Sequence, residues 1–175
     1  MANLALLNQV LSEILLCSCD ILDSGLADES GSRCGCPCRT FITAGKPVWD
    51  LASCCSDGQL SVFLNGDIYP FSNFPTRAAD ANICSPTLAA NVTVQLLRCW
   101  PATMKEDGQA PTGPEIQAAS DDIHRDLYLL TSGLVCCLKV NARRRKFILN
   151  GGRIVGPQDG CVGAEVSLIL EIMNI

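Results

Sequence analysis

Cysteine is the residue type with the clearest capacity for chemistry in this chain, which has 12 cysteines among 175 residues. Five of them gather in one stretch: Cys34, Cys36, Cys38, Cys54 and Cys55. Zinc sites use cysteine pairs with two to four residues between them, whereas this stretch has gaps of one residue or none and no nearby histidine. Disulfide bonds are therefore the first interpretation, buried free thiols the second, and an all-thiolate metal site the third.

The remaining cysteines add possible disulfide partners. Cys84 precedes a predicted strand, Cys99 ends it, and Cys161 opens the last predicted strand, so we expect these three to pair with cysteines of the 34–55 stretch. Adjacent cysteines are not expected to bridge each other, because the required geometry is strained. In the pair Cys136-Cys137, one thiol should face the core and the other a neighbouring element.

The other reactive side chains do not form a recognisable catalytic set. The single histidine, His124, falls on the polar side of a predicted helix, and no G-x-S-x-G turn supplies a nucleophile. Asp121 and Asp122 would point about 100° apart on that helix, which makes a poor carboxylate pair. A nucleotide site would lack its loop, since neither G-x-x-x-x-G-K-S/T nor G-x-G-x-x-G occurs. We therefore expect a protein that is not an enzyme and uses no cofactor.

One strongly basic stretch stands out, formed by Arg143, Arg144, Arg145 and Lys146. The chain as a whole carries a formal net charge of -5, so it lacks the clustered positive surface that general nucleic-acid binding needs. The acidic excess lies in residues 1–90, which hold 4 basic and 9 acidic side chains, while residues 91–175 hold 9 of each. A solvated face or a contact with another protein is the favoured interpretation of the basic stretch.

Composition predicts one globular domain. Apolar residues make up 48% and charged residues 18% of the sequence, which excludes a disordered tail. We expect no membrane span, because Gln9, Glu13 and Asp20 interrupt the apolar N-terminal stretch and Glu171 interrupts the C-terminal one. A secretory signal is not expected either, since the first basic residue is Arg33.

The elements that must position these residues begin with an amphipathic helix over residues 3–23, where apolar residues recur every three or four positions. Gly25 suits a left-handed position after it, and residues 24–38 are predicted to be a flexible loop. Alternating patterns predict strands over Arg39–Thr43, Gln59–Tyr69 and Leu88–Trp100. A bulge is expected at Asn65-Gly66, and Pro70 should end the second strand.

A second helix should start at Pro114 and run to about residue 140, because an apolar stripe begins at Ile116. Two strands follow, at Lys146–Leu149 with an extension to Val155 left open, and at Gly163–Met173. The order α-β-β-β-α-β-β, with short connections within each strand group, predicts an α+β fold in which two helices pack on a largely antiparallel sheet.

Several rare cysteine, glycine and proline contexts resemble one family in the same order along the chain. They are Cys36-Pro-Cys-Arg39, Trp49-Asp50, Cys54-Cys55 before Gly58-Gln-Leu60, Tyr69-Pro-Phe-Ser72 with Phe74-Pro75, Leu97-Arg-Cys99, Cys136-Cys-Leu138 and Gly156-Pro-Gln-Asp-Gly-Cys-Val-Gly163. Over about residues 36–170 the sequence resembles the head-to-tail joining proteins of actinobacterial tailed phages, of the tail-terminator type. The predicted order of helices and strands also resembles the tail-terminator fold.

The resemblance implies a structural virion protein of a long-tailed phage. A homomeric six-fold ring would sit on the head-proximal end of the tail tube, stop further growth of the tube, and offer the face to which the filled head attaches. Its partners would be the major tail tube protein and a head-completion or stopper protein. Assembly would take place in the host cytoplasm, and the finished location would be the neck of the virion.

Viral DNA would pass through the bore of such a ring without specific binding. We therefore expect an acidic or neutral lumen, and we expect Arg143, Arg144, Arg145 and Lys146 to face a neighbouring subunit or partner ring. Two alternatives stay open. One is another neck ring, a head-closure stopper or a connector, and the other is a cysteine-rich metal-binding module.

Overall fold

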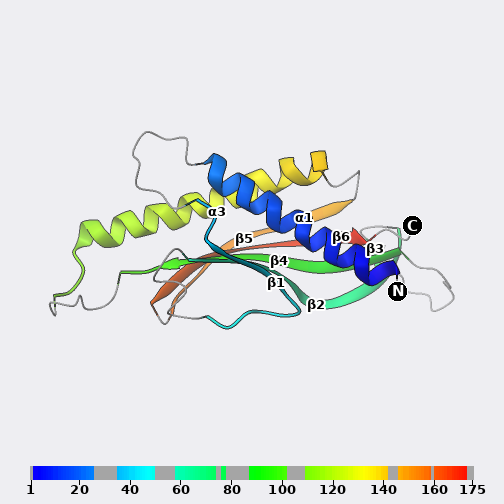
Figure 1. Ribbon diagram of the computed structural model, residues 1–175, viewed down its shortest axis with the longest axis horizontal. Coiled ribbons are helices and arrows are strands. Elements are labelled where there is room, and N and C mark those ends of the chain that lie inside the picture. The colour runs from blue at the N-terminus through cyan, green and yellow to red at the C-terminus, as the bar shows by residue number, and fades with distance from the viewer. Residues whose placement is uncertain are drawn as a thin grey trace.

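The computed structural model covers residues 1–175 and describes residues 2–25, 35–49, 58–73, 76–77, 87–101, 109–141, 146–158 and 160–172. Two helices and six strands follow one another along these residues (Figure 1). Their bounds are α1 Ala2–Ser24, β1 Arg39–Thr43, β2 Gln59–Asn73, β3 Thr76–Arg77, β4 Thr87–Cys99, α3 Gly113–Asn141, β5 Phe147–Gln158 and β6 Cys161–Ile172. The predicted α+β class is confirmed.

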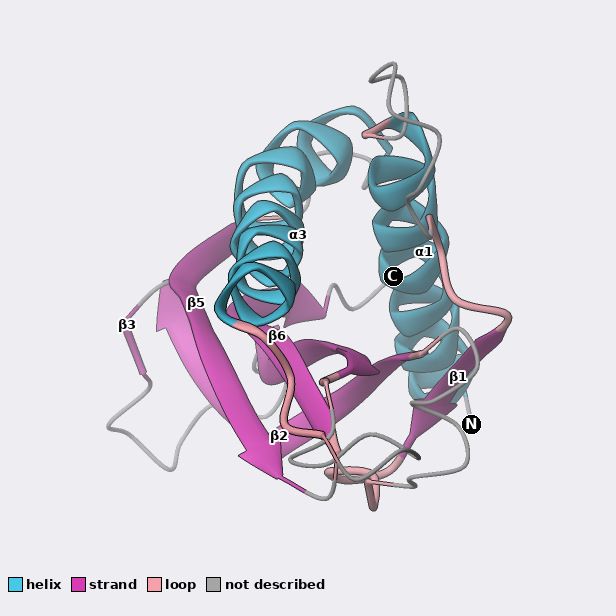
Figure 2. Ribbon diagram, turned by 90° about the vertical axis from the view of Figure 1, so that its left-hand side faces the viewer, coloured by secondary structure: helices cyan, strands magenta, loops and turns pink. Residues whose placement is uncertain are grey.

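The strands form one sheet in the order β1-β2-β4-β6-β5, with β3 paired to β2 outside that path. β2, β4, β6 and β5 pair antiparallel, as expected, but β1 runs parallel to β2. Parallel neighbours need a connection that crosses the sheet. The chain after Thr43 begins that crossing, which the prediction of hairpin-length connections missed. β1 and β5 lie at opposite edges of the sheet (Figure 2).

Both helices cover the same face of the sheet, and the main core lies between them and the strands (Figure 2). Alternation in each strand directs every second side chain to this layer. The buried residues include Leu7, Val10, Leu11 and Ile14 of α1, Leu60 and Val62 of β2, Val92, Val94 and Leu96 of β4, Leu130 and Leu134 of α3, and Val166, Leu168 and Leu170 of β6. These are the alternating and periodic positions from which the elements were predicted.

Glycines let α1 and α3 approach each other closely. A Cβ on Gly133 would come within 2.8 Å of the Ile21 side chain, and a Cβ on Gly25 would collide with Leu129. Gly25 does not take the left-handed conformation expected of it, since its φ is not positive. Its N–H instead donates to the carbonyl oxygen of Ile21 at 3.1 Å and continues the helical pattern. The glycine is required there by packing and not by its backbone dihedral.

β2 is longer than predicted. The register shift between Leu64 and Ile68 confirms the bulge at Asn65-Gly66. The prediction that Pro70 ends the strand is wrong, because β2 continues to Asn73 and Pro70 pairs with Leu88 of β4. β1 pairs only with the first part of β2, up to Phe63, so among the described residues most of the later part of β2 has a strand neighbour on one side only. Proline is tolerated at such an edge because no ladder hydrogen bond is lost there.

The other boundaries agree with the sequence patterns to within a few residues, with two exceptions. β5 extends to Gln158, past the predicted Leu149 and past Val155. The two-residue strand β3 lies between the second and third predicted strands, where no further strand was expected.

α1 is long and apolar enough to cross a membrane by length and composition alone. Its segment Ala5–Ser24 has a mean hydropathy of 1.5, so the expectation that Gln9, Glu13 and Asp20 rule out such a segment is wrong by this measure. The mean hydropathy stays high because these polar residues are few and are separated by apolar ones, although they interrupt the apolar run. In this fold 39% of the segment is buried inside the protein, as in an amphipathic helix that packs one face on a core.

Candidate functional site

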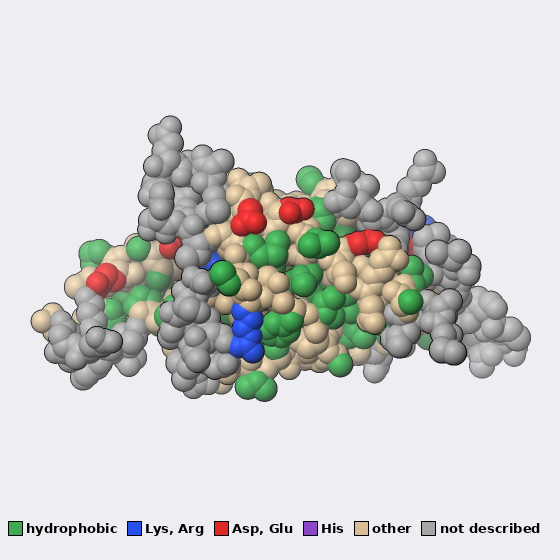
Figure 3. Space-filling view, in the orientation of Figure 1, with side chains coloured by type: hydrophobic (Ala, Val, Ile, Leu, Met, Phe, Trp, Pro, Cys, Tyr) green, Lys and Arg blue, Asp and Glu red, His purple; other side chains and the backbone are tan. Residues whose placement is uncertain are grey.

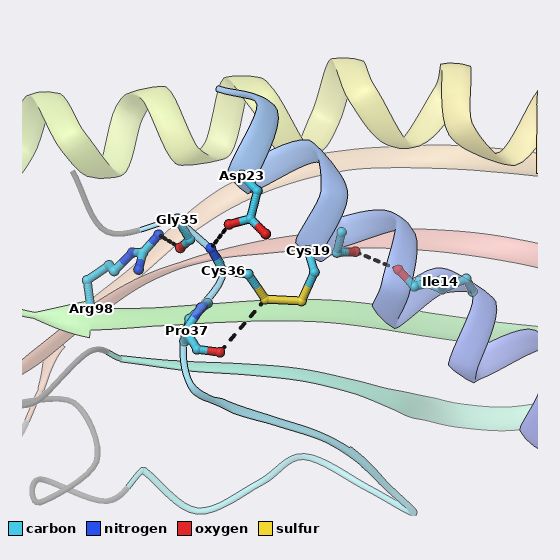
Figure 4. The surroundings of a disulfide bond; sticks show 8 residues. Ile14, Cys19, Asp23, Gly35, Cys36, Pro37 and Arg98 are labelled. Atoms are coloured by element: carbon cyan, nitrogen blue, oxygen red, sulfur yellow. Dashed lines mark hydrogen bonds between the residues drawn. A yellow bond between two sulfur atoms is a disulfide. The ribbon is translucent and has the colours of Figure 1, made fainter. Parts of the chain in front are cut away.

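Two disulfide bonds join α1 to the elements beside it. Cys17, on the core side of α1, is bonded to Cys137 of α3 with the two Cα atoms 6.1 Å apart. Cys19 is bonded to Cys36 with a Cα separation of 4.7 Å (Figure 4). α1 is therefore cross-linked both to its partner helix and to the segment that leads into β1.

The partner of Cys36 differs from the expected one. It is Cys19, and not Cys84, Cys99 or Cys161. The chain between Gly35 and β1 passes beside the C-terminal half of α1, which brings Cys36 to that helix and away from the strand ends. This part of the predicted flexible loop is thereby fixed in place.

The other candidate cysteines are distributed as follows. Cys161 is buried and disulfide-bonded, and the side chains of Cys38 and Cys99 are exposed. Cys34, Cys54, Cys55 and Cys84 lie outside the described residues.

The bond between Cys17 and Cys137 was missed, although the sequence contained its signal. Cys137 belongs to the apolar stripe of α3, and Cys17 follows Ile14 by three positions on the apolar stripe of α1. Two helices that pack through these stripes bring the two cysteines together. Cys137 packs against the core as expected of one member of its pair, while Cys136 is exposed as a free thiol and does not face a neighbouring element.

A cluster of polar contacts closes the junction between α1, β4 and α3. The N–H of Cys36 donates to Asp23 Oδ1 at 2.7 Å, which ties the junction to the end of α1 (Figure 4). Arg98 of β4 donates through Nη2 to the carbonyl oxygen of Gly35 at 2.8 Å and through Nε to Asp126 Oδ2 of α3 at 2.9 Å. Arg98 thus connects a strand, a helix and the cross-linked segment.

Asp126 is largely buried in this cluster. Burial raises the pKa of its carboxyl group above the usual 3.8 and outweighs the attraction and hydrogen bond of Arg98, which act in the opposite direction. The cost of desolvating Asp126 thus cancels much of the stability that its ion pair with Arg98 would otherwise contribute. The main effect of the pair is to hold β4 and α3 in their relative positions.

The second polar cluster lies on the face of the sheet that the helices do not cover. Glu165 of β6 is 3% exposed and accepts hydrogen bonds from three side chains. Gln95 Nε2 donates to Oε1 at 2.6 Å, Lys46 Nζ lies 3.0 Å from the same oxygen, and Arg153 donates to Oε2 through Nε at 2.9 Å and Nη2 at 2.6 Å. No local pattern in the sequence indicates this cluster, because its members lie on three strands and a connecting segment.

Burial by itself would raise the pKa of Glu165. The hydrogen bonds from Arg153, Lys46 and Gln95, together with the charge of Lys46, outweigh that effect and hold the pKa below the usual 4.5. Glu165 is therefore a charged and fully coordinated carboxylate at neutral pH, which suits a structural role better than proton transfer.

The acidic and imidazole side chains considered in the sequence do not come together in a site. His124 is exposed on α3, Asp121 accepts a hydrogen bond from Gln117 at 2.7 Å, and Asp122 pairs with Arg125 at 3.4 Å. Within the described part of the chain, no three His, Cys, Asp or Glu residues are arranged to hold a metal ion.

Of the basic stretch, Arg143, Arg144 and Arg145 lie outside the described residues, and Lys146 is exposed. The backbone of Lys146 is fixed to the end of β6, because its N–H donates to Glu171 Oε2 at 3.3 Å and its carbonyl oxygen accepts the Glu171 N–H at 3.0 Å. Its side chain is thus presented to the surface at the start of β5.

Comparison of the chain with protein-family models and with curated proteins finds no match.

Proposed function

We propose that this protein is a structural component of a phage neck, forming a ring of the tail-terminator type at the head-proximal end of the tail. The sequence resemblance over about residues 36–170 is the source of this proposal. The α+β fold, with two helices on one face of a mostly antiparallel sheet, is compatible with it.

The structural observation that supports an assembly role is the uncovered first part of α3. Its apolar stripe starts at Ile116, yet no residue from Thr112 to Asp122 is buried, and the first buried member is Ile123. This end of α3 extends past the ends of the strands (Figure 1), and hydrophobic and acidic side chains lie together on it (left side of Figure 3). An apolar stripe that continues beyond its own sheet is available for contact with another protein.

A second copy of the chain would meet this surface in a head-to-tail ring. The uncovered end of α3 and the exposed Lys146 are near opposite ends of a 29-residue helix, about 43 Å long. One subunit cannot bring these two surfaces together, whereas neighbouring subunits in a closed ring can. The basic stretch 143–146 would then face the next subunit or a partner ring.

The test is a phage that lacks this protein. We expect filled heads and separate tails of irregular or excess length, because nothing ends tube growth. Restoring the protein from a plasmid should restore joined particles, and a map of the virion should place six copies at the neck. Joined particles with tails of normal length in its absence, or a map with a different copy number at another position, would refute the proposal. Metal analysis of the purified protein separates it from a metal-binding module.

A further inference from the structure

A short segment after β1 crosses the helix-free face of the sheet. We call residues 44–49 the strap. It begins in a tight turn in which the N–H of Gly45 donates to Thr43 Oγ1 at 3.1 Å. Thr43 is the last residue of the edge strand β1, yet the side chains of the strap reach β4, β6 and β5. The strap therefore spans the sheet from one edge towards the other.

Two side chains hold the strap on the sheet. Lys46 pairs with Glu165 of β6 at 3.0 Å and lies 6.0 Å from the centre of the Trp49 ring. Trp49 packs against Leu97 of β4 and Cys161 of β6. Parts of the strap are open to solvent, since Val48 is 86% exposed and the side chain of Lys46 is 52% exposed.

The far end of the strap rests on β5. Val155 joins the same hydrophobic contact as Trp49, and a Cβ added to Gly156 would come within 3.2 Å of the Trp49 ring. Gly156 also has a backbone φ of 92°, which residues other than glycine rarely adopt. The backbone of β5 at Gly156 thus comes close to the indole ring of Trp49.

Polar side chains lie along this side of the sheet, and several of them are buried. Ser61, Gln95, Glu165 and Arg153 stand opposite one another in register across β2, β4, β6 and β5. Gln59 and Gln95 are both fully buried. Gln59 stands opposite Leu97, which Trp49 contacts, and Gln95 is bonded to the carboxylate that Lys46 contacts.

These glutamines are incompletely paired. Nε2 and Oε1 of Gln59 and Oε1 of Gln95 have no hydrogen-bond partner in the described part of the protein. A buried amide without a partner loses the hydrogen bonds that water would give it. Covering this face therefore has a free-energy cost that an uncovered face would not have.

We infer that the strap is a movable cover: in the closed state Lys46 and Trp49 hold it on the sheet, and in an open state both release and water reaches the amides of Gln59 and Gln95. Opening removes one ion pair and one aromatic contact and hydrates three polar atoms. The helix-covered core lies on the opposite face and is not disturbed.

Trp49 provides a direct probe, because the chain has only 2 tryptophans and Trp100 lies outside the strap. The full-length protein is labelled with 5-fluorotryptophan, and the two fluorine resonances are assigned with the Trp100→Phe variant. In Lys46→Met, which keeps the aliphatic stem, the Trp49 resonance should shift towards solvent and show a larger H2O/D2O isotope shift. The open population should rise about two- to five-fold, as expected from the loss of one partly exposed ion pair. Lys139→Met, a change of the same kind on α3, should leave Trp49 unchanged.

The inference is overturned if folded Lys46→Met shows an unchanged Trp49 resonance, or if Trp49 and Trp100 shift together, which would indicate general loosening. If Lys46→Met does not fold, wild-type protein is titrated with sodium chloride. Salt weakens the Lys46–Glu165 pair, so Trp49 alone should shift. A Trp49 resonance that does not respond to salt would equally overturn the inference.

Discussion

Gly163 marks a close approach between β6 and β4. A Cβ at this position would collide with the carbonyl oxygen of Leu96 and lie 2.6 Å from the Leu97 side chain. Gly163→Ala should therefore lower the free energy of unfolding by about 1–3 kcal/mol, measured by urea denaturation. Gly45→Ala is the matched control, because nothing lies within 4 Å of its added Cβ. Equal stabilities for the two variants would contradict this packing.

Glu165 should make stability depend on pH. Its pKa is lowered on folding, so the stabilisation is fully present above the usual value of 4.5 and is lost as the pH falls through the folded-state pKa. Glu165→Gln should have a lower free energy of unfolding than wild type at neutral pH. The difference in free energy between the two proteins should narrow as the pH falls below 4.5.

Thermal unfolding over a pH series measures this effect. Asp20→Asn, a neutralisation at an exposed position of α1, should instead follow the wild-type curve. A difference between Glu165→Gln and wild type that stays constant into the acid range would show that the carboxylate is not the group responsible.

At the scale of elements, the bond between α1 and α3 should make a large contribution to stability. Cys17 and Cys137 are 120 residues apart, and closing such a loop restricts the unfolded chain strongly. Replacing both by alanine should lower the free energy of unfolding by about 2–4 kcal/mol in non-reducing urea titrations. Cys136→Ala removes an exposed thiol and should have almost no effect. A double variant as stable as wild type would show that the packing of α1 on α3 is sufficient without the bond.

The elements that the sequence predicts best are those whose periodicity reports one buried face. The alternation of Val166, Leu168 and Leu170 and the stripe of α3 from Ile123 gave helices and strands close to the observed ones. Pairing partners were harder to predict, because alternation is identical for parallel and antiparallel neighbours. The parallel β1 and the continuation of β2 through Pro70 follow from the arrangement of neighbouring strands.

In the candidate sites, too, the residue types could be predicted from the sequence but their pairing partners could not. Cysteine content predicted disulfide bonds, but the pairing of Cys19 with Cys36 depends on how the chain between α1 and β1 returns beside the helix. The network around Glu165 depends on the cross-strand register, which brings Gln95 and Arg153 to either side of it. A local sequence window contains no information about such register.

At the scale of the whole molecule, a substitution at the uncovered end of α3 should affect assembly of the ring without preventing folding of the subunit. Ile116 is 39% exposed, so Ile116→Asp should lower the free energy of unfolding of the isolated chain by only about 1 kcal/mol, which leaves it folded. The same change should abolish complementation of a phage that lacks the protein, because it puts a charge into the proposed subunit contact. Ser132→Asp, on an exposed position of the covered half of α3, should complement normally. Normal particle yields with Ile116→Asp would exclude this surface from the assembly.

The position of α1 in the chain also has a consequence during synthesis. α1 is complete at Ser24, but the disulfide partner of Cys17 and the helix against which α1 packs are both in α3, which ends at Asn141. At about 5–20 residues per second, the ribosome needs roughly 6 to 23 s to make the chain between these points. Throughout that interval the nascent chain carries an apolar helical segment without its partner, which is the kind of segment that chaperones bind. Chains released before α3 is made should therefore be recovered with chaperones or in the insoluble fraction.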